Sequence, residues 1–220
     1  MIKITSSICG TIVSNALVTT NEKGVTALEF TMRVEIPSRS KGHSSVDVLV
    51  VVNDSNHEHI KDYCNGNRIV MNGAMTVKKA DDTLVFILRD AQPQITYGVP
   101  ADDYIKGDLS FTGKVYNVSE RMDKRGRNFL VMSASSPIKA GHNQWDYIWV
   151  NFLRFTSKMV KAEDLVPDWL VSGVSVEILG DFQVTSYNKR IGISSRVVEM
   201  CQKETVEEGK NGETEEVAPF

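Results

Sequence analysis

Three aromatic residues alternate along one short segment of this 220-residue chain: Trp145, Tyr147 and Trp149. Side chains of a β-strand point to opposite faces in turn, so a strand here would carry the three rings on one face and Ile148 and Val150 on the other. Exposed rings on a strand can stack on planar groups, and every nucleic-acid base offers such a face. We therefore expect the rings to face solvent. The alternative is that the rings form the core and the strand is reversed.

Basic residues near this segment could bind the phosphates of the same ligand. The stretch 121–127, RMDKRGR, places four cationic side chains around Gly126 in a loop between two expected strands. Charged loops are usually only solvated, but beside an aromatic strand such a loop can hold a phosphate backbone. Besides the three rings, the residues of the second half expected to contact a nucleic acid are Tyr116, Arg121, Lys124, Arg125, Arg127, Arg154, Lys158, Tyr187, Lys189 and Arg190.

The chain contains an internal sequence repeat. Four segments of the first half match four of the second in the same order, at offsets of 103, 102, 99 and 107 residues. One such match arises easily by chance, whereas four in order indicate a repeated unit whose loops differ in length. The matched pairs are CGTIV (9–13) with TGKVY (112–116), KGVTAL (23–28) with RGRNFL (125–130), GHSSVDVLVVV (42–52) with GHNQWDYIWVN (141–151), and GNRIVMNGAMTV (66–77) with GVSVEILGDFQV (173–184).

The first copy is poorer in stacking groups. The third match places Val46, Val48 and Val50 where the second copy has its aromatic row, and valine cannot stack on a base. An exposed valine stripe would be an unexplained apolar patch, so we expect it to pack against another barrel, within the chain or between chains. Phe30 and Phe86 are expected in the core. The cationic candidates of this copy are Lys23, Arg33, Arg39, Lys41, Lys78 and Lys79.

Each copy has the same order of elements: three segments with strand periodicity, a short helix-like stretch, then two more strands. The helix-like stretches are SNHEHIKDYC (55–64) and AEDLVPDWLV (162–171). This is the order of the five-stranded OB barrel. We therefore predict an all-β protein of two tandem five-stranded OB-fold barrels, each with a short helix between strands 3 and 4, plus a disordered acidic C-terminal tail. The predicted boundaries are 1–96 for the first barrel, 97–106 for a linker, 107–202 for the second barrel and 203–220 for the tail.

The net charge of −3 is a poor sign for a nucleic-acid binder until its distribution is considered. Residues 1–96 are neutral, 97–106 carry −1, 107–202 carry +2 and 203–220 carry −4. The tail therefore supplies the negative balance and leaves a basic second half.

Other classes of protein find little support in the sequence. Three widely spaced cysteines fit a reducing cytoplasm, where we expect the protein to act. The longest aliphatic run, Val48 to Val52, is far short of the roughly 20 residues of a membrane span, and no secretion signal is recognisable. No phosphate-cradling loop or catalytic motif is recognisable either, and His57, His59 and Cys64 lack a fourth zinc ligand. We expect no enzyme activity, no cofactor and no metal.

The C-terminal segment, residues 203–220, differs in composition from the rest of the chain. Residues 203–220 contain six glutamates and no hydrophobic periodicity, so they cannot bury enough surface to offset their chain entropy. The segment nevertheless ends in a compact apolar group that suits a pocket with a basic rim, so we expect it to dock on partner proteins. The alternative is a solvating tail. The residues expected to make this contact are Glu215, Glu216, Val217, Ala218, Pro219 and Phe220.

Two OB-like units followed by an acidic tail ending in Pro-Phe resemble the bacterial and phage single-stranded DNA-binding proteins. The end EEVAPF (215–220) fits the acidic tail of that family. The segment QWDYIWVNF (144–152) is similar to its third strand, in which a Trp is followed by alternating residues and an aromatic residue. Most members carry one OB unit per chain, so the tandem arrangement is a departure.

The resemblance implies sequence-independent binding of single-stranded DNA, protection of exposed strands, and recruitment of replication, recombination and repair proteins through the tail. A phage-encoded member would act in the host cytoplasm. Four OB units per assembly are common in the family, which favours a homodimer, with a monomer as the alternative. The alternative functions are another OB-type nucleic-acid module (one that binds RNA or assists a primosome or recombinase), a nuclease, or a protein–protein scaffold.

Overall fold

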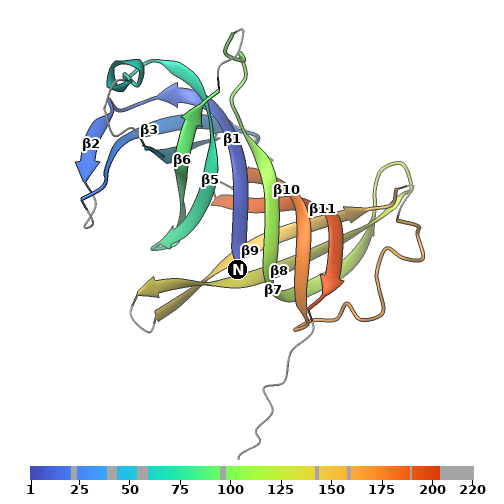
Figure 1. Cartoon of the computed structure of the whole chain (residues 1–220). Coiled ribbons are helices and arrows are strands. Elements are labelled where there is room, and N and C mark those ends of the chain that lie inside the picture. The colour runs from blue at the N-terminus through green and yellow to red at the C-terminus, as the bar shows by residue number, and fades with distance from the viewer. Residues whose placement is uncertain are drawn as a thin grey trace, which may run out of the picture.

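The computed structural model describes residues 1–20, 24–38, 44–53, 59–94, 98–141, 144–157, 160–188 and 190–203. These residues form one continuous 11-stranded sheet and one 3-10 turn, η1 (Ile60–Asp62) (Figure 1). The strands of the first half are β1 (Ile2–Ile12), β2 (Leu17–Thr20), β3 (Thr26–Ile36), β4 (Ser44–Val52), β5 (Arg68–Ala80) and β6 (Thr83–Pro93). Those of the second half are β7 (Tyr104–Met122), β8 (Asn128–Gly141), β9 (Gln144–Phe155), β10 (Ser175–Tyr187) and β11 (Arg190–Gln202). Within the described ranges, no helix is long and apolar enough to cross a membrane.

Five strands of the first half close into a ring. The pairs β1–β5, β5–β6 and β3–β4 are antiparallel, β4–β6 is parallel, and β3 returns to β1 at Thr11 and Ile12. Phe30, Met32 and Phe86 fill the interior and are each at most 2% exposed. Alternate side chains of each strand point inward. The apolar residues that recur at every second position of these strands therefore form the core of the barrel.

Five strands of the second half close into another ring. The pairs β7–β8, β8–β9, β10–β11 and β7–β10 are antiparallel, and β9–β11 is parallel. Phe111 and Phe152 meet edge to face in the interior, with ring centroids 5.0 Å apart. The all-β class predicted from the sequence is confirmed, and β9, which carries the aromatic row, belongs to this second ring.

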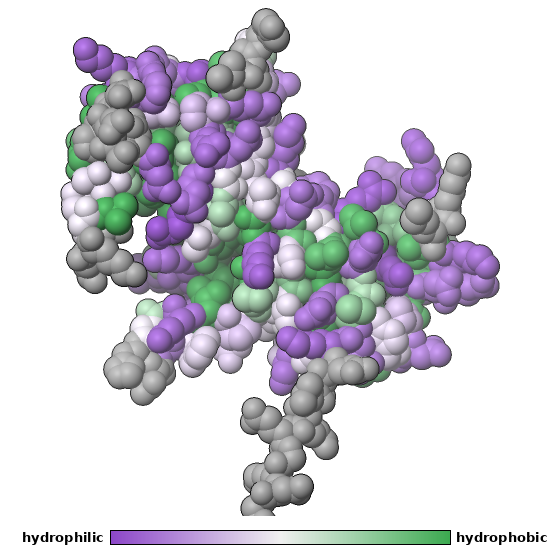
Figure 2. Space-filling model, viewed as in Figure 1, coloured by the Kyte–Doolittle hydropathy of each residue, from purple (hydrophilic) through white to green (hydrophobic). Residues whose placement is uncertain are grey.

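The two rings are joined through their first strands. β1 and β7 pair in antiparallel fashion from Ile2 opposite Phe111 to Cys9 opposite Tyr104. β7 therefore begins at Tyr104, inside the segment that the sequence assigns to a linker. On the side of the molecule drawn in Figure 2, polar side chains are widespread, and apolar side chains gather where the first ring meets the strands of the second.

Arg68 fixes the connection between the rings. Its guanidinium donates hydrogen bonds to the carbonyls of Pro100 (2.9 Å) and Ala101 (3.1 Å) and forms an ion pair with Asp103. The other carboxylate oxygen of Asp103 accepts the N–H of Glu35 on β3 at 2.7 Å. These side-chain contacts hold residues 100–103 against the first ring, directly before the start of β7 at Tyr104.

The helix predicted at 162–171 is wrong. This segment forms successive turns, in which Leu165 N–H donates to Ala162 and Leu170 N–H donates to Pro167. Pro167 has no N–H for a helical bond. Leu165 is buried, and the carbonyls around it accept hydrogen bonds from Arg154. Of the helix predicted at 55–64, residues 55–58 lie outside the described part, and the remainder contains only the short turn η1.

The outward orientation predicted for the valines of β4 is also wrong. Val46, Val48 and Val50 are at most 5% exposed and line the interior of the first ring, so they do not pack on another barrel. The pairing explains the error, because Val50 lies opposite Phe30 as Phe152 lies opposite Met132. These pairs keep an offset of 102 residues, whereas the sequence match uses 99. A slip by an odd number of residues moves every side chain to the other face of a strand.

Candidate nucleic-acid interface

The aromatic row of β9 lies on the outside of the second ring. Trp145, Tyr147 and Trp149 are 60%, 55% and 51% exposed, whereas Ile148 and Val150 are fully buried. The orientation predicted from the alternation is confirmed, and the reversed orientation is wrong. Three large rings held half in solvent are unusual for a surface strand, which makes this face a candidate binding surface.

The neighbouring strands leave room around the rings. On β8, Ser135 lies opposite Trp149, Pro137 opposite Tyr147 and Lys139 opposite Trp145. Small partners such as serine and proline do not cover an indole or phenol ring. One strand further along, Tyr116 of β7 lies with its ring centroid 5.3 Å from that of Trp149, with the planes tilted by 49°. Tyr116 and Trp149 therefore form one aromatic wall.

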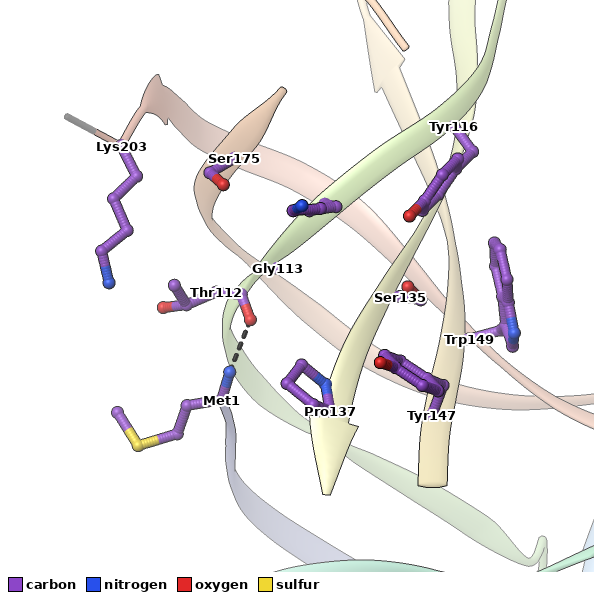
Figure 3. Close-up of a pocket in the computed structure, with 11 residues that line it drawn as sticks. Met1, Thr112, Gly113, Tyr116, Ser135, Pro137, Tyr147, Trp149, Ser175 and Lys203 are labelled. Atoms are coloured by element: carbon purple, nitrogen blue, oxygen red, sulfur yellow. Dashed lines mark hydrogen bonds between the residues drawn. The ribbon is translucent and has the colours of Figure 1, made fainter. Parts of the chain in front are cut away.

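This wall borders a groove of about 820 Å³ (Figure 3). Tyr116, Tyr147 and Trp149 lie on one side of the groove, and Ser175 and Lys203 lie on the other. The remaining lining residues are Met1, Thr112, Gly113, Lys114, Ser135 and Pro137. The groove thus combines flat apolar faces with the ammonium groups of Lys114 and Lys203, the two kinds of group needed for a base and its phosphate.

The basic loop between β7 and β8 is ordered by Asp123. One carboxylate oxygen accepts hydrogen bonds from the backbone N–H groups of Arg125 (2.8 Å) and Arg127 (3.0 Å). The other accepts a hydrogen bond from the side-chain Nε–H of Arg127 at 2.9 Å. These bonds, led by the one from the Arg127 N–H, hold the pKa of the Asp123 carboxyl below its usual range. Gly126, with φ of +75°, completes the turn. Arg121, Lys124 and Arg125 are exposed around this turn, where we predict phosphate contacts.

Other predicted contacts of the second half lie away from the groove. Arg154 has the parity of the interior residues of β9 and donates to the carbonyls of Asp164 (2.8 Å) and Leu165 (3.0 Å). Burial lowers the pKa of its guanidinium. Tyr187 and Arg190 lie at the β10–β11 hairpin, where the adjacent Ser186 accepts a hydrogen bond from Ser44 of the first ring at 2.8 Å. Lys158 and Lys189 lie outside the described residues.

The first ring offers a poorer surface. The outer positions of β4 are Ser45, Asp47, Leu49 and Val51, with no aromatic residue among them. Arg33 is paired with Asp47 through two hydrogen bonds of 2.8 and 2.9 Å, which lower the pKa of that carboxyl. The other described candidates, Lys78 and Lys79, are exposed at the end of β5. Lys23, Arg39 and Lys41 lie outside the described residues.

Sequence reasoning missed Lys114, Pro137, Lys139 and Lys203. A signal existed for Lys114, because it stands two residues before Tyr116 and so shares its face of β7. Lys139 and Pro137 could have been found by closing the β8–β9 hairpin, whose register sets them opposite two of the rings. Lys203 reaches the groove because β10 lies beside β7, which periodicity within one segment does not reveal.

Searches against protein-family models and against curated proteins return no match. Among solved structures, the chain is similar to the wild-type single-stranded DNA-binding protein from Thermus aquaticus. The TM-score is 0.50 at 10% sequence identity, over 92% of this chain and 93% of that chain. A mitochondrial single-stranded DNA-binding protein from S. cerevisiae matches 43% of this chain and 91% of its own, with 14% identity and a TM-score of 0.34. The likeness to the Thermus protein shows that the chain shares its fold, as the sequence resemblance predicts.

Proposed function

We propose that the protein binds single-stranded DNA without sequence preference, through the outer face of β7, β8 and β9. The observation that carries this proposal is the row of half-exposed rings, of which Tyr147 and Trp149 border the lysine-rimmed groove. Stacking is sequence-tolerant because every base has a π-face, and lysines bind phosphates of any sequence. The fold shared with the Thermus protein, whose name states that it binds single-stranded DNA, agrees with this function.

The spacing of the rings favours a single strand over a duplex. Alternate residues of a strand lie about 6.8 Å apart, twice the 3.4 Å rise per nucleotide of a stacked strand. Rings at this spacing fit bases that have separated from one another. A duplex hides its base faces in the stack and would offer this surface only its phosphates. Stacking therefore supplies the preference for single strands, and the cations supply an attraction common to both forms.

We infer that the two rings are tandem OB-fold barrels with different roles. The second barrel, including Trp145 on the β8–β9 hairpin, holds the DNA. The first barrel has no aromatic row on β4, and its Arg33 is neutralised by Asp47. Its strands β1, β3 and β5 instead support β7 and residues 100–103. In this division, the first barrel is chiefly a scaffold for the second.

The experiment that tests this function is competition for a labelled oligothymidylate, followed by fluorescence anisotropy. Unlabelled single strands of several sequences should displace the probe at similar concentrations. Duplex of the same length should displace it far more weakly, and the affinity for single strands should fall with salt. Displacement by duplex as readily as by single strands would refute the proposal. Stronger displacement by oligouridylate than by oligothymidylate would assign the site to RNA.

We further propose that residues 203–220 recruit replication and repair proteins. The last described residue, Lys203, lines the groove, so the acidic tail starts at the DNA-binding surface. Binding energy of a docked peptide concentrates in a few apolar anchors, here Phe220 with the conformationally restricted Pro219. Glutamates would steer the peptide toward a basic rim.

Deletion of Phe220 should abolish capture of partner enzymes from host extract and leave the affinity for single-stranded DNA unchanged. The apolar anchor is lost, while every groove residue stays in place. A pull-down with the parent and the deleted protein measures the first effect, and anisotropy measures the second. Equal recovery of the same replication or repair enzymes by both proteins would show that the terminal Phe is incidental.

A further inference from the structure

The outer face of β9 continues beyond the aromatic groove. After Trp149, the residues with the same parity are Asn151, Leu153 and Phe155, so Phe155 lies on this face about 20 Å from Trp149. The Phe155 ring stacks on that of Phe129, its partner on β8, with centroids 5.4 Å apart and planes 19° apart. The two phenyl rings make a second aromatic surface at the far end of the same strand.

Two guanidinium groups gather at this surface. The Cζ atom of Arg196 on β11 lies 5.0 Å from the centroid of the Phe155 ring. Arg127 comes from the basic loop, where its ion pair with Asp123 at 2.8 Å holds it in place. Arg127, Phe155 and Arg196 line a hollow of about 270 Å³ together with Asn128 and Thr156.

The position of Arg196 is set by its backbone. β10 has a register shift at Gly180, where a Cβ atom would lie 2.5 Å from the carbonyl oxygen of Arg196. The absence of a side chain at this glycine lets β11 approach closely. The N–H of Arg196 donates to the Asp181 carboxylate. These contacts fix the main chain and leave the exposed guanidinium over the phenyl ring.

We propose that Arg127, Phe155 and Arg196 form a second subsite, which takes one base and its phosphate from the strand that occupies the aromatic groove. The proposal rests on the proposed function. The exposed guanidinium of Arg196 can bind phosphate through paired donors, Arg127 adds a donor-rich group held in place by Asp123 beside it, and both phenyl and guanidinium planes stack on bases. The path of about 20 Å corresponds to about six nucleotides at the 3.4 Å rise of a stacked strand, and to fewer when the strand is extended. Only oligonucleotides long enough to span this path gain from the subsite.

The first ring supplies a matched control. Arg89 on β6 is exposed, and its carbonyl oxygen would lie 2.6 Å from a Cβ atom at Gly73, close to the 2.5 Å between the Arg196 oxygen and a Cβ atom at Gly180. At the offset of 102 residues, Asn53 of the first ring corresponds to Phe155 of the second. The side-chain amide of Asn53 donates a hydrogen bond to the Asp90 carboxylate at 2.6 Å. Arg89→Gln therefore removes the same charge at a corresponding position that lacks the phenyl ring.

The test is a length series of labelled oligothymidylates, from about three to about twelve nucleotides, with the parent, Arg196→Gln, Phe155→Leu and Arg89→Gln. We expect Arg196→Gln and Phe155→Leu to match the parent on the shortest oligonucleotides that it binds. On the longest ones they should bind about tenfold more weakly. Arg196→Gln should also flatten the log–log salt dependence by about 0.7 on the longest oligonucleotide. Arg89→Gln should follow the parent at every length.

Parent-like affinity of both variants for long oligonucleotides, or an equal loss at every length, would overturn the subsite and leave the proposed function standing. A parent that binds no oligonucleotide would overturn both. Arg196 is exposed, so its variant tests the subsite even if Phe155→Leu fails to fold.

Discussion

The double variant Tyr147→Ala/Trp149→Ala is expected to bind single-stranded DNA at least about 2 kcal/mol more weakly than the parent, a loss of about thirtyfold in affinity. Each stack of a base on an aromatic side chain contributes about 1–3 kcal/mol, and both rings line the groove. Both are more than half exposed, so their removal should change the free energy of unfolding little. Anisotropy titration measures the affinity, and urea unfolding confirms that the fold is kept.

Trp169→Phe is the matched control for this variant. Trp169 lies in the turns between β9 and β10 and packs against the core, on a segment that does not line the groove. The control also removes an indole but should keep the affinity of the parent. A folded double variant that binds as tightly as the control would show that the DNA does not run through the groove.

Arg68→Ala should lower the free energy of unfolding by about 2–4 kcal/mol. The substitution leaves the carboxylate of Asp103, which is 12% exposed, without its ion-pair partner. It also removes the donor to the carbonyls of Pro100 and Ala101. Losing one partner of a half-buried ion pair costs more than the pair contributes, because the other charge stays desolvated. Urea denaturation followed by circular dichroism measures the change.

Arg33→Ala is the control that shows whether the destabilisation depends on the position of Arg68 or follows the loss of any paired arginine. Arg33 also forms an ion pair at 2.8 Å, but the side chains of Arg33 and Asp47 are 52% and 48% exposed. Exposed pairs contribute about 0.2–1 kcal/mol, so this variant should be nearly as stable as the parent. Equal destabilisation by the two substitutions would mean that Arg68 is an ordinary surface residue and does not clip the connection.

The face that β9 turns to solvent could be predicted because the reason for it is local. Aromatic residues outside and aliphatic residues inside alternate over the span from Tyr147 to Val150, and a strand converts that alternation directly into two faces. The same reasoning failed on β4, because every residue from Val48 to Val52 is aliphatic. Without alternation, the outward face of β4 can be assigned only from the match to β9, and that match is wrong by three residues because the loops of the two copies differ in length.

The helix predicted near Pro167 failed for a tertiary reason. The apolar spacing of residues 162–171 does suit a helix, but Leu165 and Leu170 are buried from successive turns. Arg154, on β9, supplies the donors that the carbonyls of Asp164 and Leu165 would otherwise find within a helix. A donor that comes from a different element leaves no mark on the local pattern.

The cationic side of the groove is formed only when the strands of the second ring pair with one another. Tyr147 and Trp149 could be predicted from the alternation in β9, but Lys203 directly follows β11 and Lys114 belongs to β7. These two cations share a groove with Trp149 only after β7 has paired with both β8 and β10. The cationic cluster around Gly126 lies in a loop, where charge is easy to notice, whereas Lys114 stands alone within β7 and Lys203 directly follows β11.

Tryptophan fluorescence during titration with single-stranded and duplex oligonucleotides, at a low and a high salt concentration, tests the central claim most directly. Trp149 and Trp145 report from the proposed DNA-binding face itself. We expect a single strand to quench the emission at both salt concentrations, with weaker affinity at high salt. Duplex should cause little quenching at either concentration, because its bases cannot reach the rings. Saturating binding of single-stranded DNA without quenching, or equal quenching by duplex, would contradict the account.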